Sequence, residues 1–156
     1  MNLPKERDCM KKYIFTILCV TIALLTFVGC NRSTHISYDA YEELVKNLQS
    51  KGYTIDAEDV EKSILSGERK WLTIDGSENI SVYLYGSNAE MEKDASYLAD
   101  DGFSYNNGKN DVQIEWVSYP HFYKSENMIV LYVGENLEII QALEEFMGPQ
   151  FTGNIE

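Results

Sequence analysis

Few side chains in this 156-residue chain could carry out catalytic chemistry. The chain has three cysteines, Cys9, Cys19 and Cys30, and His121 is its only histidine beyond residue 36. A nucleophilic triad needs a general base, and His121 follows Pro120 in an extended run with no nucleophile motif beside it. We therefore expect His121 to make a structural hydrogen bond at a sheet edge, and we assign no catalytic residue.

Carboxylates are the most abundant reactive groups, with 25 Asp and Glu residues in the chain. Glycosidase chemistry needs two carboxylates about 5 to 9 Å apart in a cleft. An envelope enzyme that acts on carbohydrate through such a pair is therefore the alternative function. A chain this acidic brings carboxylates together by chance, so we expect nearly all of them to lie on the solvated surface.

Calcium is the one metal that the pattern of oxygen-bearing side chains suggests. Asp75, Ser77 and Asn79 alternate within one turn, and oxygen atoms are the ligands that calcium prefers. The spacing of a calcium-binding loop with its distal Glu is missing. We therefore expect no metal site and no cofactor.

Two tyrosines in an expected strand are stronger candidates for binding. Tyr83 and Tyr85 alternate with Val82 and Leu84, so the tyrosines share one face of the sheet. If helices cover the opposite face, the tyrosines form an exposed aromatic strip, which suits stacking on sugars or anchoring a protein partner. The alternative is that they pack against each other or under a loop.

The segment after Pro120 is the second candidate binding region. It contains His121, Phe122 and Tyr123 in an extended run that ends before the turn at residues 125–127. Proline donates no hydrogen bond and restricts the residue before it, so we expect a bend or sheet edge here. A partner could reach such an edge.

The N-terminal segment has the composition of an export signal. An apolar run over residues 13–28 is followed by the small Gly29 and by Cys30. The basic residues before this run are Lys5, Arg7, Lys11 and Lys12. The segment resembles a bacterial lipoprotein signal with its lipobox, in which Phe27 stands where the family usually has Leu.

This resemblance implies that Cys30 is lipidated with a diacylglyceryl group and becomes the first residue of the mature protein. Residues 1–29 are then the signal peptide, 30–36 a tether and 37–156 a single domain on the extracytoplasmic face of the cell membrane. The alternatives are an uncleaved anchor and a secretory signal that is cut elsewhere. In both alternatives the positive-inside rule places the remainder of the chain outside the membrane.

Charge excludes one class of partner. Without residues 1–29 the chain keeps 9 basic and 23 acidic residues, a net charge of −14. Such a charge repels phosphate backbones, so we expect no nucleic acid partner.

Without residues 1–29, Cys30 is the only cysteine left, which excludes an internal disulfide and a cysteine zinc site. The expected partners are the bilayer, through Cys30, and an unidentified protein or envelope component.

Helices are predicted at three places. Tyr41, Leu44, Val45 and Leu48 have the spacing of an amphipathic helix that begins after Ser37 and ends before Gly52. A second helix follows Gly86, with Ser87 and Glu90 as a capping box and Gly102 as its end. The last helix runs from Leu137 to Met147. The acidic residues 56–62 permit a further short helix.

Strands are predicted between these helices. Residues 71–74 and 80–85 flank a turn-forming run and should pair antiparallel. Residues 103–111 read as a loop and 112–117 as a strand. Met128 to Val133 is the most hydrophobic strand, and its continuous apolar run predicts a central position in the sheet.

A weak internal repeat relates the two strand-to-helix joints, residues 82–91 and 130–139. In both, a strand ends at Gly86 or Gly134 and an Asn precedes the helix. The pattern predicts an α+β fold: an antiparallel sheet with helices packed on one face, ferredoxin-like in arrangement, with two β-β-α units after an N-terminal helix.

The C-terminal part of the chain also resembles known sequences. The runs PHFYK at 120–124, IVLYVG at 129–134 and GPQF at 148–151 look like the signature of uncharacterised small lipoproteins from Gram-positive-type bacteria. The resemblance is good over the last third and loose over the rest. It implies membrane attachment and no enzymatic activity, so we expect a non-enzymatic binding or interaction module.

Overall fold

The structure, a computed structural model, describes residues 36–153. The predicted signal peptide, Cys30 and all of the tether except Ile36 lie outside the described residues. The elements in chain order are α2 (Asp39–Ser50), β1 (Ile55–Val60), β2 (Glu68–Ile74), β3 (Glu78–Leu84), α3 (Asn88–Ala95), β4 (Ser104–Asn106), β5 (Asp111–Gln113), β6 (Pro120–Ser125), β7 (Met128–Val133), α4 (Leu137–Met147) and β8 (Thr152–Gly153).

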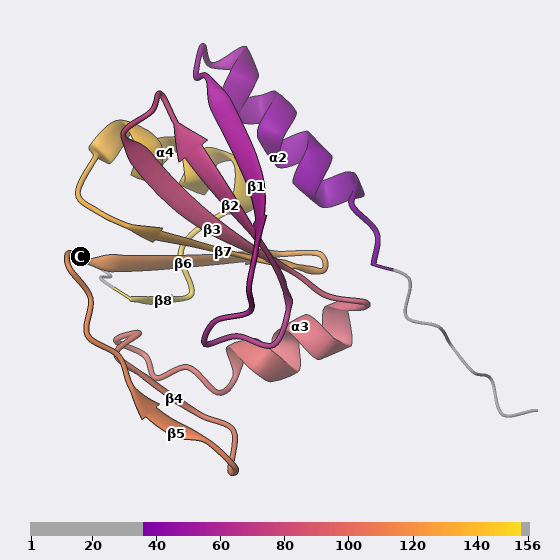
Figure 1. The fold of residues 1–156 in the computed structure, drawn as a ribbon, viewed down its shortest axis with the longest axis vertical. Helices are drawn as coiled ribbons and strands as arrows, with labels where there is room; N and C mark the ends of the chain where they lie inside the picture. The colour runs from indigo at the N-terminus through magenta and orange to yellow at the C-terminus, as the bar shows by residue number, and fades with distance from the viewer. Residues whose placement is uncertain (1–35, 154–156) are drawn as a thin grey trace, which may run out of the picture. The chain divides into compact units, whose positions relative to one another are not determined.

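The fold is α+β, as predicted, and it is built on one antiparallel sheet (Figure 1). Six strands pair in the order β1-β2-β3-β7-β6-β8, and β4 and β5 form a separate hairpin. Every strand pairing is antiparallel. The apolar β7 lies in the middle of the sheet, between β3 and β6, which confirms its predicted central position.

Two β-β-α units are present, in agreement with the internal repeat. The β2-β3 hairpin leads into α3 and the β6-β7 hairpin leads into α4, and the two hairpins meet where β3 pairs with β7. Side chains cap both helix starts, because Ser87 Oγ accepts from the Glu90 N–H at 3.2 Å and Asn136 Oδ1 from the Glu138 N–H at 3.1 Å. Of the predicted capping box, only the bond to Ser87 Oγ forms among the described residues, and the Glu90 carboxylate does not return a bond to the Ser87 N–H. The ferredoxin-like arrangement is not confirmed.

The helices are divided between the two faces of the sheet. Ile80, Val82 and Leu84 of β3 pack with α2 and α4, whereas Tyr83 and Tyr85 belong to the apolar cluster that includes α3. Successive residues of a strand point to opposite faces, so these clusters lie on opposite sides. The prediction of helices on one face therefore holds for α2 and α4, whereas α3 packs on the opposite face. Figure 1 shows α3 and the β4-β5 hairpin below the sheet.

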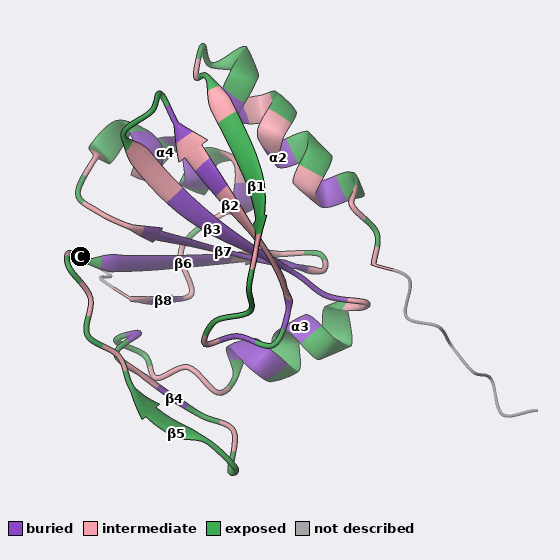
Figure 2. Ribbon diagram, in the orientation of Figure 1, coloured by how far each residue is buried: buried purple, intermediate pink, exposed green. Residues whose placement is uncertain are grey.

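The acidic residues 56–62 do not form the predicted short helix. Residues 55–60 are strand β1, which pairs along its whole length with β2. It is an edge strand with four exposed residues in its middle (Figure 2). Charged residues on an edge strand hinder pairing with another chain, which explains why the strand lacks an apolar alternation.

Residues 103–117 also differ from the prediction. Residues 104–106, expected in a loop, form β4, and the strand expected over 112–117 is reduced to its pairing at 111–113. The remaining residues, 114–119, form no strand and lead to β6. The hairpin closes at Asn107, whose side chain accepts from the N–H groups of Lys109 and Asn110.

The three predicted helices are present, with some changed bounds. Helix α4 has the predicted bounds, and α2 begins at Asp39, with Tyr38 rather than Ser37 at the N-cap position. Helix α3 ends at Ala95, seven residues before the predicted Gly102, because Leu98 instead forms a bridge to Tyr105. This bridge connects the end of α3 to the β4-β5 hairpin.

Candidate functional site

The five predicted binding residues are all buried. Their exposed fractions are 1% for Tyr83, 4% for Tyr85, 4% for His121, 1% for Phe122 and 0% for Tyr123. Tyr83, Tyr85 and Phe122 belong to the cluster on the α3 side of the sheet, and Tyr123 to the α4 side. Tyr83 and Tyr85 therefore do not form an exposed strip, and the alternative that they pack under neighbouring segments is correct.

His121 makes structural contacts on the α4 side of the sheet. Its Nε2 donates to the carbonyl oxygen of Gly134 at 3.0 Å, and its Nδ1 lies 3.0 Å from the side-chain oxygen of Gln150. The ring stacks on Tyr132 with 5.9 Å between ring centroids. With both ring nitrogens and one ring face engaged, His121 ties β6 to the exit of β7.

An open groove lies on the α3 side of the sheet, beyond the area that α3 covers. We call it the tryptophan groove: a hollow of about 370 Å³ whose walls include Arg69, Trp71, Tyr83, Trp116 and Leu131. It is formed by β2, β3, β7 and the segment after β5. Both tryptophans of the chain line it.

Strand geometry places one wall of the groove. Arg69 and Trp71 are two residues apart in β2, so they point to the same face, and the register places Tyr83 opposite Arg69 and Ser81 opposite Trp71. The Arg69 guanidinium lies 5.1 Å from the Trp71 ring centroid and 5.9 Å from that of Tyr83. It also donates to Ser81 Oγ at 2.9 and 3.2 Å. These contacts fix the Arg69 side chain against Trp71, Tyr83 and Ser81.

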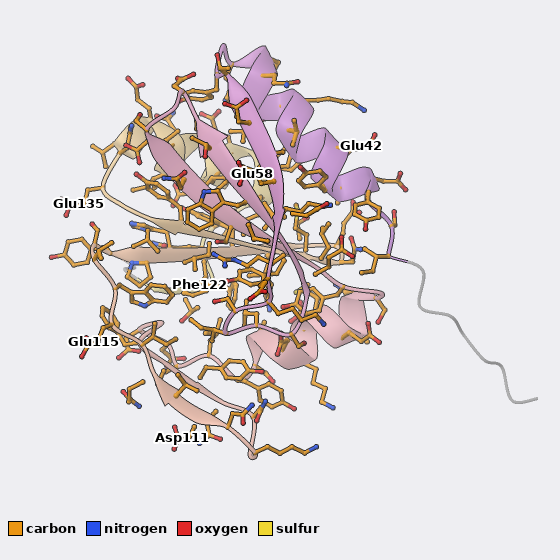
Figure 3. The ribbon with its side chains drawn as sticks, in the orientation of Figure 1. Glu42, Glu58, Asp111, Glu115, Phe122 and Glu135 are labelled. Carbon is orange, nitrogen blue, oxygen red and sulfur yellow. The ribbon has the colours of Figure 1, made fainter. Side chains whose placement is uncertain are left out.

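The segment after β5 places the opposite wall. Trp116 donates its indole N–H to the carbonyl oxygen of Gly102 at 2.9 Å and meets Phe122 edge to face, with 6.1 Å between ring centroids. Trp71 likewise donates its indole N–H to Asn79 Oδ1 at 3.0 Å. Because both indole N–H groups are used internally, each tryptophan offers mainly apolar ring surface to the groove. Glu115, labelled in Figure 3, adds a carboxylate.

A buried carboxylate lies nearby, at the side of α3. Asp94 is 4% exposed and accepts four hydrogen bonds: from the hydroxyls of Tyr85 (2.8 Å), Tyr105 (2.7 Å) and Ser66 (3.0 Å) and from the N–H of Ser66 (2.7 Å). We call these four residues the Asp94 cluster. It joins α3 to β3, to the β4-β5 hairpin and to the loop before β2.

The tyrosines of the Asp94 cluster are held in the neutral, hydrogen-donating form. Burial, with the hydrogen bond to Asp94, raises the pKa of Tyr105 to about 12. Burial and the charge of Asp94 raise the pKa of Tyr85 further above its usual range. Both hydroxyls are therefore protonated at neutral pH, and they hold Asp94 in a network that connects these elements.

Two of the three side chains suggested for calcium already accept hydrogen bonds within the protein. Asp75 Oδ1 accepts from the N–H of Thr54 at 2.7 Å, and Asn79 Oδ1 accepts from both Trp71 and Thr73. Within residues 36–153, no three His, Cys, Asp or Glu side chains come together in a way that could hold a metal ion. None of the described helices has the length and apolar character needed to span a bilayer.

Comparison with protein-family models, with curated proteins and with solved structures finds no match for this chain. The function of the site is therefore inferred from its own geometry.

The sequence analysis did not predict Arg69, Trp71 and Trp116 as site residues, although one signal was available: a basic and an aromatic residue two positions apart in a strand share a face. It also missed Asp94, because nothing local marks which of many carboxylates will be buried.

Proposed function

We propose that the chain is a lipid-anchored lipoprotein on the extracytoplasmic face of the membrane, and that its domain is a non-enzymatic binding module. We further propose that the tryptophan groove holds carbohydrate of an envelope partner. The signal pattern that ends at Cys30 supports the anchoring. The groove supports the binding.

One observation carries the choice of ligand: both tryptophans line one groove, and both are fixed by hydrogen bonds of their own indole N–H groups. Aromatic rings with no free polar atom suit the C–H faces of sugar rings. Arg69 makes no ion pair among the described residues, so its remaining N–H groups can donate to sugar hydroxyl or carboxylate groups. Walls that are already ordered reduce the entropy lost on binding.

The alternative, an enzyme that acts on carbohydrate, has less support in this groove. Its two lining carboxylates are Glu78 and Glu115. Glu78 accepts from the hydroxyl of Tyr132 at 2.8 Å and from Asn136, both on the α4 side of the sheet. Both oxygen atoms of its carboxylate are therefore already hydrogen-bonded on the α4 side, whereas a glycosidase needs two carboxylates that converge on one bond.

Tryptophan emission offers a direct test of the groove. Because the chain has two tryptophans and both line the groove, the emission of the full chain reports on this site alone. Titration with soluble N-acetylglucosamine oligomers and cell-wall glycan fragments should change the emission in a saturable way. An emission that stays constant would leave the proposed ligand without support.

The anchoring predicts a second result. Cys30→Ser should move the protein from the membrane fraction to the soluble or secreted fraction, because the variant has no thiol at the predicted lipidation position to carry the acyl chains. Each CH₂ group buried in the bilayer contributes about 0.8 kcal/mol to membrane binding, so two acyl chains anchor a protein stably. A protein without acyl chains lacks this anchor. Fractionation of cells with a high-salt wash measures this.

Cys19→Ser is the matched control, since Cys19 lies within the predicted signal peptide and would be removed with it. The control should fractionate with the wild type. If Cys30→Ser also stays in the membrane, the N-terminal segment is an uncleaved anchor instead.

A further inference from the structure

A second and larger cavity opens beside helix α3, and its lining shares no residue with that of the tryptophan groove. It has a volume of about 630 Å³ and lies between the loop before β2, the end of β3, helix α3 and the β4-β5 hairpin. Tyr85, Asp94 and Tyr105 of the Asp94 cluster contribute to its lining. We call it the lysine cavity, because Lys62, Lys93 and Lys109 also line it.

These three lysines differ from every other lysine in the described chain. Residues 36–153 contain seven lysines, and the other four form ion pairs with carboxylates: Lys46 with Glu42, Lys51 with Glu145, Lys70 with Asp59 and Glu68, and Lys124 with Glu92. Within the same residues, Lys62, Lys93 and Lys109 have no ion pair. The lysines without a carboxylate partner are therefore the ones that line this cavity.

The three lysines come from segments far apart in the sequence. Lys62 belongs to the loop before β2, Lys93 to α3 and Lys109 to the β4-β5 turn. Bringing like charges together is unfavourable unless an anion lies between them. In a chain this acidic, carboxylates were available to pair with each of them, so their gathering around one hollow points to an anionic ligand.

The carboxylates in the lining do not neutralise these lysines. Asp94 accepts its four hydrogen bonds within the Asp94 cluster, and Glu68 accepts from the Tyr38 hydroxyl at 2.7 Å and lies 3.5 Å from Lys70. Glu90 alone has a carboxylate with no partner among the described residues. It can accept from a hydroxyl group of the same ligand.

We propose that the lysine cavity binds a phosphate ester that also carries hydroxyl groups, such as a glycerol phosphate unit. Lysine is a point charge with three donors and suits phosphate oxygens approached from several directions. The tyrosines of the Asp94 cluster are neutral, and their hydroxyls donate to the carboxylate of Asp94, which also lines the cavity. This inference does not depend on carbohydrate binding in the tryptophan groove.

The phosphate ester can have two sources, a soluble molecule or a phospholipid headgroup. Ile36 lines the cavity and follows Cys30 by six residues, a distance of at most about 20 Å for an extended chain. If Cys30 is lipidated, as proposed above, headgroups at the membrane surface come within reach. The chemistry of recognition is the same for both sources.

Calorimetric titration of the full chain in a neutral detergent tests the proposal. The probes are glycerol 3-phosphate, short-chain phosphatidylglycerol below its micelle concentration and short-chain phosphatidylcholine. Either of the first two should bind, with affinity that falls as salt is added. Tighter binding of glycerol 3-phosphate identifies a soluble ligand, and tighter binding of phosphatidylglycerol identifies a headgroup.

Two triple variants with the same change of charge separate the site from general electrostatics. Replacing Lys62, Lys93 and Lys109 by Gln should lower the affinity about 10-fold or more, because the charge-assisted contacts are lost. Replacing the ion-paired Lys46, Lys51 and Lys124 by Gln should change it less than about 2-fold, since these lysines lie outside the cavity. Thermal melting should show both variants folded.

Two results would overturn the proposal: no binding of either anion to the wild type, or an equal loss of affinity in both triple variants. If the cavity variant does not fold, the three single Lys→Gln variants replace it. Each should then weaken binding about 3-fold while melting with the wild type, because these side chains are exposed and make no hydrogen bond among the described residues. Unchanged affinity in all three overturns it equally.

Discussion

Asp94→Ala is expected to lower the free energy of unfolding by about 3 kcal/mol. The carboxylate accepts four hydrogen bonds, and its removal leaves the buried hydroxyls of Tyr85 and Tyr105 without an acceptor. Each unsatisfied buried group costs about 1 to 3 kcal/mol. Denaturant unfolding of the purified full chain measures the loss.

Two further substitutions separate the hydrogen bonds from other effects. Asp94→Asn keeps the shape and one carbonyl oxygen, so it should cost about 1 kcal/mol. Asp100→Ala removes an exposed carboxylate five residues beyond α3, and it should leave stability nearly unchanged. If Asp94→Ala unfolds at the same denaturant concentration as Asp100→Ala, the Asp94 cluster does not hold these elements together.

Gly134→Val should lower the free energy of unfolding by about 3 kcal/mol, from overpacking against a buried ring. A Cβ at this position would overlap the hydroxyl of Tyr132. That hydroxyl donates to Glu78 at 2.8 Å and accepts from the N–H of Asn136 at 3.1 Å, so it cannot move without losing both bonds. Gly134 is not left-handed, so the close approach of Tyr132, and not the backbone conformation, is the physical reason for glycine where this strand ends.

A double-mutant cycle tests this reason. In a Tyr132→Leu background the hydroxyl and the ring atoms that a Cβ at Gly134 would overlap are both absent, so Gly134→Ala should cost about 1 kcal/mol less than it does in the wild type. Chemical denaturation of the four proteins gives the coupling. Additive costs would show that the backbone of Gly134, and no clash with Tyr132, makes the glycine necessary.

The elements that the sequence predicts well are those with local signals. Helix α4 has its apolar spacing, its Asn136 cap and its Gly148 end within one short stretch, so its bounds follow from the sequence. The β2-β3 hairpin has a turn-forming run between two β-rich segments. In both, the residues that decide the structure are neighbours in the chain.

Strands β1 and β4 could not be predicted because their partners decide them. Residues 56–60 have no alternating pattern, and they are extended because β2 supplies the hydrogen bonds. Residues 104–106 lie in a stretch rich in Asn and Gly, and β4 exists because β5 folds back on it. Tertiary pairing outweighs local preference in such short segments.

The candidate sites also combine features that local patterns predict with features that only the tertiary structure decides. The alternation in β3 places Tyr83 and Tyr85 on one face, as predicted, but only the position of α3 decides that this face is covered there. Farther along the sheet that face stays open, and Trp71 lies in the open part. The lysine cavity needs three segments to converge, which no local pattern reveals.

Carbohydrate binding in the tryptophan groove is the central claim, and tryptophan emission during oligosaccharide titration tests it most directly. In the full chain we predict a saturable change that Trp71→Ala weakens about 10-fold, about 1.4 kcal/mol of binding free energy. Tyr119→Ala, which removes a 51% exposed aromatic residue outside the groove lining, should bind as the wild type does. An emission that stays constant up to millimolar oligosaccharide, or equal affinity of Trp71→Ala and the wild type, would contradict the claim.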